Sequence, residues 1–213
     1  MNDVGVKLQH VTKAYNKHIV LDDVSVEFEV GKIHGIIGRN GSGKTQLFKV
    51  IAGYVAADRG ETVVFDKVVG KQINHPDSMG ILLETPGFLS EYSGFFNLQL
   101  LAAMNTKLTA AEIENALSDV GLKDAGHKKV KTYSLGMRQR LGIAQAIMGN
   151  PQLVILDEPF NGLDHVGVEE IRKLILRLKE NGKTVLLASH YAEDIEYLCD
   201  TVHRMEAGVI RKA

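Results

Sequence analysis

The sequence predicts an α/β fold that combines a strand-rich core with a helical insertion. Strand and helix patterns alternate at both ends of the 213-residue chain, as in folds built on a parallel sheet. A glycine loop at residues 38–45 separates a short apolar strand from a helix, whereas the pattern of residues 86–149 is mostly helical. We therefore expect one domain over 1–213, with a core of residues 1–85 and 150–213 and a helical subdomain between them.

The N-terminal part of the chain has the pattern of strands around one helix. Residues 6–30 alternate apolar and polar side chains on either side of a turn at 15–18, which is typical of a strand pair. The apolar segment 32–38 predicts a buried strand, and a helix follows the glycine loop. Two further strands are expected at 60–66 and 79–84.

The helical insertion carries a clear helix start. Thr109 and Glu112 have the spacing of a capping box, and Gly121 stands where that helix would end. After the insertion the expected elements are a buried strand at 151–159, a helix at 168–182, a buried strand at 183–190, a helix that contains Cys199, and a strand pair that turns at Ala207 and Gly208.

The bulk composition excludes several classes of protein. The formal net charge is −1, which gives no sign of a nucleic-acid surface. No segment approaches the roughly 18 apolar residues that a membrane-spanning helix requires, and the N-terminus lacks the pattern of a signal peptide. The single cysteine, Cys199, is expected to be a packed core thiol. We therefore expect a cytosolic protein that does not itself cross a membrane.

The stretch GRNGSGKT has the spacing of a phosphate-binding loop, G-x-x-x-x-G-K-[ST]. It follows a strand and opens a helix, which distinguishes it from a plain glycine turn with a stray lysine. Gly41 and Gly43 let the backbone curl so that N–H groups face phosphate oxygens. Lys44 is expected to reach the β- and γ-phosphates, and the Thr45 hydroxyl to bind Mg²⁺. The expected nucleotide-binding residues of this loop are Gly38, Arg39, Asn40, Gly41, Ser42, Gly43, Lys44, Thr45 and Gln46.

An acidic pair follows the apolar strand in LVILDEP. Asp157 ends the strand and is placed to hold Mg²⁺ through water, and Glu158 is placed to act as a base for the attacking water. Such a pair is often only a solvated strand edge, but the phosphate loop upstream favours a catalytic role.

Two further residues are ambiguous from their local sequence. His190 ends the last buried strand and is placed to reach the γ-phosphate, although a histidine there is more often an ordinary polar terminus. Tyr15 lies in an early turn, where it can stack on a base, although a surface tyrosine is the commoner case.

The stretch TYSLGMRQRLGIAQAI, residues 132–147, predicts an amphipathic helix with an unusual start. Ser134 stands where an N-cap is expected, and Gly136 lies in the first turn, where glycine weakens a helix. A helix that only packs against a core has no need for a glycine in its first turn.

The order of these motifs resembles the ATP-binding subunits of ABC transporters over the whole chain: phosphate loop, helical insertion, YSLGMRQR, LVILDEP, NGLD and ASH. The resemblance implies a P-loop NTPase core of the RecA-like type with an N-terminal β subdomain and an inserted α-helical subdomain. It also implies that Ser134 and Gly136 bind the γ-phosphate of a nucleotide held by a second subunit. In the same way, His190 matches the switch histidine, Tyr15 the residue that stacks on adenine, and Asp164 a residue at the dimer seam.

Four positions depart from the family pattern. Tyr133, Leu135 and Met137 replace the usual Leu, Gly and Gln of the signature, which implies weakened or retuned closure. Glu84 replaces a glutamine that touches the metal and the membrane partner; a carboxylate can still bind Mg²⁺, but donates a hydrogen bond only when protonated. The alternative for Glu84 is a solvated strand end. LLETPGF and SLGMRQRLGIAQAI are similar to the branch that exports bacitracin-type and lantibiotic-type peptides.

The resemblance implies an ATPase, with ATP and Mg²⁺ as cofactors and with Lys44, Glu158 and His190 as catalytic residues. It implies a dimer of two identical or closely related ATP-binding subunits at the cytoplasmic face of the membrane, bound to a separate transmembrane permease and to no nucleic acid. The alternative is a soluble ABC ATPase that acts on nucleic acid or ribosomes. Such proteins usually carry a coiled-coil insertion, a zinc module or a second ATPase unit, and the sequence contains none of these. A regulatory dimer without turnover, and a phosphoryl-transfer enzyme that shares only the loop, are less favoured.

Overall fold

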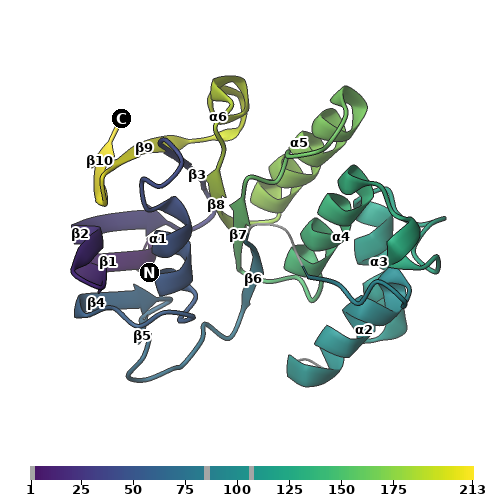
Figure 1. Cartoon of the computed structure of the whole chain (residues 1–213), viewed down its shortest axis with the longest axis horizontal. Coiled ribbons are helices and arrows are strands. Elements are labelled where there is room, and N and C mark those ends of the chain that lie inside the picture. Colours follow the sequence, from purple (N-terminus) through teal and green to yellow (C-terminus); the bar gives the residue numbers. More distant parts are fainter. Residues whose placement is uncertain (1–2, 84–86, 106–107) are drawn as a thin grey trace.

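The computed structural model describes residues 3–83, 87–105 and 108–213 (Figure 1). Its helices and strands in chain order are β1 (Val4–Tyr15), β2 (His18–Glu29), β3 (Ile33–Ile37), α1 (Lys44–Ile51), β4 (Arg59–Val64), β5 (Lys67–Val68), β6 (Met79–Leu82), α2 (Gly94–Asn105), α3 (Ala110–Asp119), the 3₁₀ turn η1 (Val130–Thr132), α4 (Leu135–Ile147), β7 (Leu153–Asp157), α5 (His165–Glu180), β8 (Thr184–Ala188), α6 (Ala192–Leu198), β9 (Thr201–Glu206) and β10 (Val209–Lys212). In these three ranges no helix has the length and apolar character needed to span a bilayer.

The N-terminal strands form an antiparallel sheet in the order β2-β1-β4-β5. The turn between β1 and β2 is at the predicted place, with Asn16 and Lys17 in the left-handed region at φ 46° and 68°. The buried side of the sheet packs on α1 through residues such as Leu8, Phe28 and Phe48. The two-residue strand β5 was not expected, because so short a segment carries no periodicity.

A second sheet, in the order β10-β9-β3-β8-β7-β6, runs through the middle of the molecule. Its strands are parallel to their neighbours except β10, which returns antiparallel to β9. Every residue of β7 and β8 is buried, as in a sheet covered on both faces. Alternate residues of these strands contribute to two different apolar clusters, one with α1 and the antiparallel sheet, the other with α4 and α5.

The helical segment 94–147 lies on the side of the molecule opposite the antiparallel sheet (Figure 1). The predicted capping box is confirmed: the Thr109 hydroxyl accepts from Glu112 N at 3.3 Å, and Thr109 N donates to the Glu112 carboxylate at 2.8 Å. Gly121 follows the end of α3 with a φ of +74°. These local signals therefore set the bounds of α3 as expected.

One prediction about the C-terminal part was wrong. Cys199 does not lie inside a helix, because α6 ends at Leu198 and Cys199 adopts an extended backbone as its C-cap. Its sulfur is partly buried and occupies the space beside Gly35, where an added Cβ would lie 2.8 Å from Sγ. Burial raises the pKa of the thiol to about 12, so Cys199 stays protonated and acts as packing.

We expect the buried His203 on β9 to make the fold less stable in acid. Its ring lies edge-on to Phe28 at 5.2 Å between centroids, and its Nδ1 has no hydrogen-bond partner among the described residues. Burial, with smaller contributions from His34 and Lys212, lowers its pKa to about 4. An unfolded histidine titrates near pH 6.5, so between about pH 6.5 and 4 the unfolded chain binds more protons than the folded chain.

We therefore expect the free energy of unfolding to fall as the pH is lowered through this window. Urea titrations at pH 7 and pH 5 measure it, and His203→Phe, which retains the aromatic contact, should show a smaller drop. Equal drops in parent and variant would exclude His203 as the cause.

Candidate functional site

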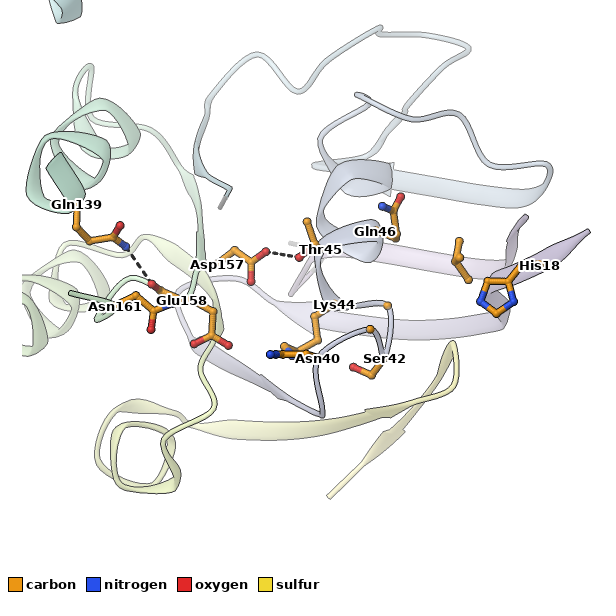
Figure 2. A pocket seen from close by; sticks show the side chains of 13 residues that line it. His18, Asn40, Ser42, Lys44, Thr45, Gln46, Gln139, Asp157, Glu158 and Asn161 are labelled. Carbon is orange, nitrogen blue, oxygen red and sulfur yellow. Dashed lines mark hydrogen bonds between the residues drawn. The ribbon is translucent and has the colours of Figure 1, made fainter. Parts of the chain in front are cut away.

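Three neighbouring parallel strands bring the motif residues to one edge of the central sheet. The strands lie side by side in the order β3, β8, β7. Strand β3 ends just before the glycine loop, β8 ends just before Ser189, and β7 ends at Asp157. Because parallel strands end at the same edge, residues far apart in sequence meet there. A cavity of about 600 Å³ opens at this edge, lined by His18, Val20, Asn40, Gly41, Ser42, Gly43, Lys44, Thr45, Gln46, Gln139, Asp157, Glu158 and Asn161 (Figure 2).

The glycine loop is tightly enclosed by its neighbours. Gly43 is the N-cap of α1 with a φ of 111°, and a Cβ added there would lie 2.7 Å from Val20 O. A Cβ on Gly38 would lie 2.3 Å from Met205 O. Each of these two positions therefore accepts only glycine. Without side chains there, the backbone N–H groups at the start of the helix stay uncovered. The Ser42 hydroxyl is buried without a partner among the described residues, and thus fits a loop built for an anionic ligand.

Lys44 lies inside the curl of this loop. It is 6% exposed, and its ammonium donates to the carbonyl of Gly38 at 2.8 Å and to that of Arg39 at 3.4 Å. Within the described residues its hydrogen-bond partners are carbonyl oxygens and not a carboxylate, and the side chain lines the cavity (Figure 2). This arrangement suits a phosphate, because one cation and several N–H groups converge on the same space.

Thr45 and Asp157, the two expected Mg²⁺ ligands that the structure describes, are in contact. The Thr45 hydroxyl donates to the Asp157 carboxylate at 2.5 Å, although the two residues are 112 positions apart (Figure 2). Hydroxyl and carboxylate oxygens next to a phosphate loop fit Mg²⁺, which prefers few protein oxygens together with substrate phosphates. The third expected ligand, Glu84, lies outside the described residues.

Glu158 is held in an unusual backbone conformation. Its φ of 54° is in the left-handed region, which costs energy for any residue other than glycine. Three hydrogen bonds maintain it: Glu158 N donates to Ala188 O at 2.9 Å, and Glu158 O accepts from Gln139 Nε2 at 3.0 Å and Asn161 N at 3.3 Å. The conformation turns the carboxylate toward the cavity.

His190 is the direct partner of that carboxylate. Its Nδ1 lies 2.7 Å from Glu158 Oε2, and its backbone N donates to the same oxygen at 3.3 Å. The Glu158 side chain is 20% exposed and that of His190 is 46% exposed, so the pair is open to solvent and ligand. A carboxylate and an imidazole in contact can orient and deprotonate a water molecule.

Tyr15 lies at the edge of the site. Its hydroxyl donates to Gln46 Oε1 at 3.2 Å, its ring is 44% exposed, and the Lys13 ammonium is 5.3 Å from the ring centroid. Tyr15 is absent from the residues that line the cavity in the described part of the chain, whereas His18 and Val20 are among them. Its ring is therefore available for stacking next to the loop.

We expect Tyr15→Ala to weaken nucleotide affinity by about 1–3 kcal/mol, the range for stacking of a base on an aromatic ring. Isothermal titration with a non-hydrolysable ATP analogue measures the change. Tyr15→Phe is the matched control, because it removes the bond to Gln46 and keeps the ring. If alanine and phenylalanine weaken binding equally, the hydroxyl and not the ring is responsible.

Ser134 and Gly136 form the exposed start of α4. The Ser134 hydroxyl caps the helix by accepting from Met137 N at 3.2 Å. Gly136 packs against the loop before α5, since a Cβ there would lie 2.8 Å from Gly162 O. Neither residue lines the phosphate-loop cavity in the part of the chain that the structure describes. The helix start is thus not part of the cavity of its own chain, although Gln139 further along α4 is.

The unusual Tyr133 has a packing role. It is 5% exposed, and its hydroxyl donates to Ala125 O at 2.7 Å inside the helical segment. An added Cβ on Gly94 would lie 2.5 Å from that hydroxyl, so the small residue and the large one fit together. Leu135, by contrast, is 63% exposed at the helix start.

Gln139 and Asn161 were not predicted as site residues. Gln139 is 7% exposed on the buried side of α4, and a polar residue in such a position usually has a specific partner. The sequence shows this polar residue within the helix pattern. It does not show which residue Gln139 contacts, because Glu158 lies 19 positions away. His18 was missed because turn residues carry no periodic pattern.

Known proteins are similar to this chain over most of its length. The family model described as ABC transporter matches residues 21–161. A bacitracin transport ATP-binding protein of Enterococcus faecalis is 40% identical over 95% of this chain and 67% of its own length. A lantibiotic transport ATP-binding protein of Streptococcus pyogenes is 34% identical over 96% of this chain and 88% of its own length.

Solved structures have the same fold. A dimeric ATP-binding cassette in a post-hydrolysis state with ADP and Pi superposes with a TM-score of 0.91, at 22% identity, over 98% of this chain and 97% of its own. The ATP-binding subunit of an ABC transporter superposes with a TM-score of 0.87, at 27% identity, over 98% of this chain and 89% of its own. The predicted fold class is thereby confirmed.

Proposed function

This chain belongs to the ABC transporter family as an ATP-binding ATPase subunit, and on that premise we propose that it dimerises around two ATP molecules and drives a separate transmembrane exporter. The observation that carries the proposal is the contact of His190 with Glu158, which lines the cavity together with Lys44, Thr45 and Asp157. A binding loop alone needs no such pair, whereas hydrolysis needs a base beside the γ-phosphate.

Within one site, the loop N–H groups and Lys44 hold the β- and γ-phosphates. Glu158 accepts a proton from the attacking water, and His190 keeps the carboxylate directed toward it through the 2.7 Å contact. Thr45 and Asp157 would hold Mg²⁺, which supplies charge stabilisation at the phosphates when bound. Tyr15 stacks on the adenine beside Gln46.

A second subunit completes each site. The exposed start of α4 at Ser134 and Gly136 is outside its own chain's cavity, and its uncovered N–H groups suit a γ-phosphate presented by a twofold-related copy. Closure of the dimer is thereby linked to the presence of ATP. We propose that residues 86–149 move as the subdomain that transmits closure to the permease at the cytoplasmic face of the membrane, with Glu84 at the contact.

The cargo is proposed from the relatives. Proteins named for bacitracin transport and lantibiotic transport cover 95% and 96% of this chain, which supports antimicrobial peptides as the exported class. The membrane subunit contacts the cargo, so purification of the chain in its native membrane complex, with identification of the subunits that accompany it, tests this part.

Two inactive variants test the composite site. Lys44→Ala breaks the loop, and Ser134→Arg blocks the helix start, so each variant alone should have both sites inactive. In the mixed dimer one site combines both lesions, and the other pairs an intact Lys44 with an intact Ser134. We expect single-turnover hydrolysis to return at one of the two sites of each mixed dimer, while the homodimers in the mixture stay inactive.

The control is each variant alone at the same total concentration. If the mixed dimer forms, as seen by differential tags, and hydrolysis does not return, the signature acts within its own chain or only in packing. Single-turnover rates are preferable to steady-state rates, because cooperation between the two sites can hide a partial rescue.

A further inference from the structure

A buried ion pair lies behind the segment that carries His190. Arg172 on α5 donates from Nε and Nη2 to Asp194 Oδ1 on α6, at 2.9 Å and 2.6 Å. The Asp194 side chain is 3% exposed and that of Arg172 is 17% exposed. The hydrogen bond to Asp194 raises the pKa of Arg172. The pair joins two helices that flank β8.

The second oxygen of Asp194 reaches the switch segment, which we define as Ser189, His190 and Tyr191. The Ser189 hydroxyl donates to Asp194 Oδ2 at 3.2 Å and accepts from Tyr191 N at 3.1 Å. Ser189 is 1% exposed. The residues on both sides of His190 are therefore tied to one buried carboxylate.

His190 itself is the exposed member of the segment. Its ring lies on that of Tyr191 with 3.9 Å between centroids, and its Nδ1 contacts Glu158. Little else restrains a histidine that is 46% exposed, so its direction depends on the backbone that carries it. That backbone is restrained on its buried side by Ser189 and Asp194, in addition to the bond from His190 N to Glu158.

We infer that Asp194, held in place by Arg172, is a positioning residue that sets the direction of the His190 ring toward Glu158. Stability alone is a weak reason for such a pair, because the cost of removing two charges from water offsets much of their attraction. Arg172 donates twice to Oδ1 and Ser189 donates to Oδ2, so both carboxylate oxygens are held, and the planar guanidinium is well suited to fixing the orientation of Asp194. The inference rests on the proposed role of His190 in hydrolysis.

The first test compares two carboxylates that contact the same arginine. Asp194→Asn removes the charge behind the switch segment. Glu169→Gln removes the charge of the other carboxylate that accepts from Arg172. The Glu169 carboxylate accepts from Nη1 at 2.7 Å, and its side chain is 39% exposed. We expect Asp194→Asn to lower single-turnover hydrolysis at least about tenfold, since small displacements of a reacting group cost up to about 100-fold. ATP affinity should be unchanged, and Glu169→Gln should hydrolyse as the parent does.

A second variant separates positioning from stability. Arg172→Met combined with Asp194→Leu replaces the pair by apolar side chains, a change that is often neutral for folding. We expect its melting temperature to be close to that of the parent and its hydrolysis to stay low, because leucine cannot accept from Ser189. If hydrolysis recovers together with stability, Asp194 has only a structural role and the inference is wrong.

A spectroscopic measurement follows the His190 ring directly. In ¹⁵N spectra of the histidine side chains of the full chain, assigned with His190→Ala, the Nδ1 signal should change in Asp194→Asn and remain in place in Glu169→Gln. An unchanged signal in Asp194→Asn would overturn the inference. If His190→Ala hydrolyses ATP at the parent rate, the proposed role of His190 fails instead, and the spectra still decide whether Asp194 directs the ring.

Discussion

Replacing Lys44 by alanine is expected to abolish ATP turnover. Its ammonium is buried in the loop at 2.8 Å from the Gly38 carbonyl, and it is the lysine that lines the phosphate-loop cavity in the described part of the chain. Without it no lysine or arginine side chain among the described residues lines the cavity to balance the charge that develops on the β- and γ-phosphates. Loss of one such preorganised group costs about 10²–10³-fold in rate even where other groups remain.

Phosphate release by the purified chain measures this loss, at saturating ATP and Mg²⁺. Lys173→Ala is the matched control, because Lys173 is an exposed lysine on α5 far along the sequence from the loop. Turnover of Lys44→Ala within twofold of the parent would refute the assignment of residues 38–45 as a phosphate loop.

Glu158→Gln is expected to retain ATP binding and to slow hydrolysis by about 10²–10⁴-fold, the contribution of a general base. Glutamine has the same shape, so the backbone bonds to Ala188 and Gln139 remain. Its amide oxygen can still contact His190 but cannot take a proton from water. The site should therefore hold ATP in the closed dimer for longer than the parent does.

Binding and chemistry are measured separately for this variant. Fluorescent-nucleotide titration gives the affinity, and size-exclusion chromatography with ATP gives the fraction of dimer. Asp157→Asn serves for comparison, because it alters a proposed Mg²⁺ ligand and should weaken binding as well. If Glu158→Gln binds ATP no better than Lys44→Ala, the residue maintains the strained turn at φ 54° and is not the base.

The sequence by itself predicted the features that depend on neighbours in the chain. The capping box at Thr109, the glycine loop before α1 and the apolar strands β7 and β8 follow from spacing and periodicity, because helix and strand geometry repeats over a few residues. The prediction for Cys199 was wrong, since the end of a helix without a glycine or proline signal depends on what packs against it.

Tertiary structure alone decided which of these features meet. The contacts of Thr45 with Asp157, of Glu158 with His190 and of Arg172 with Asp194 join residues 112, 32 and 22 positions apart. The strand order β3-β8-β7 creates the first two, and no local pattern encodes an order of strands. The sequence also did not predict that Tyr133 is buried. A motif shows which residue stands at a position, but packing determines whether its side chain points into the protein.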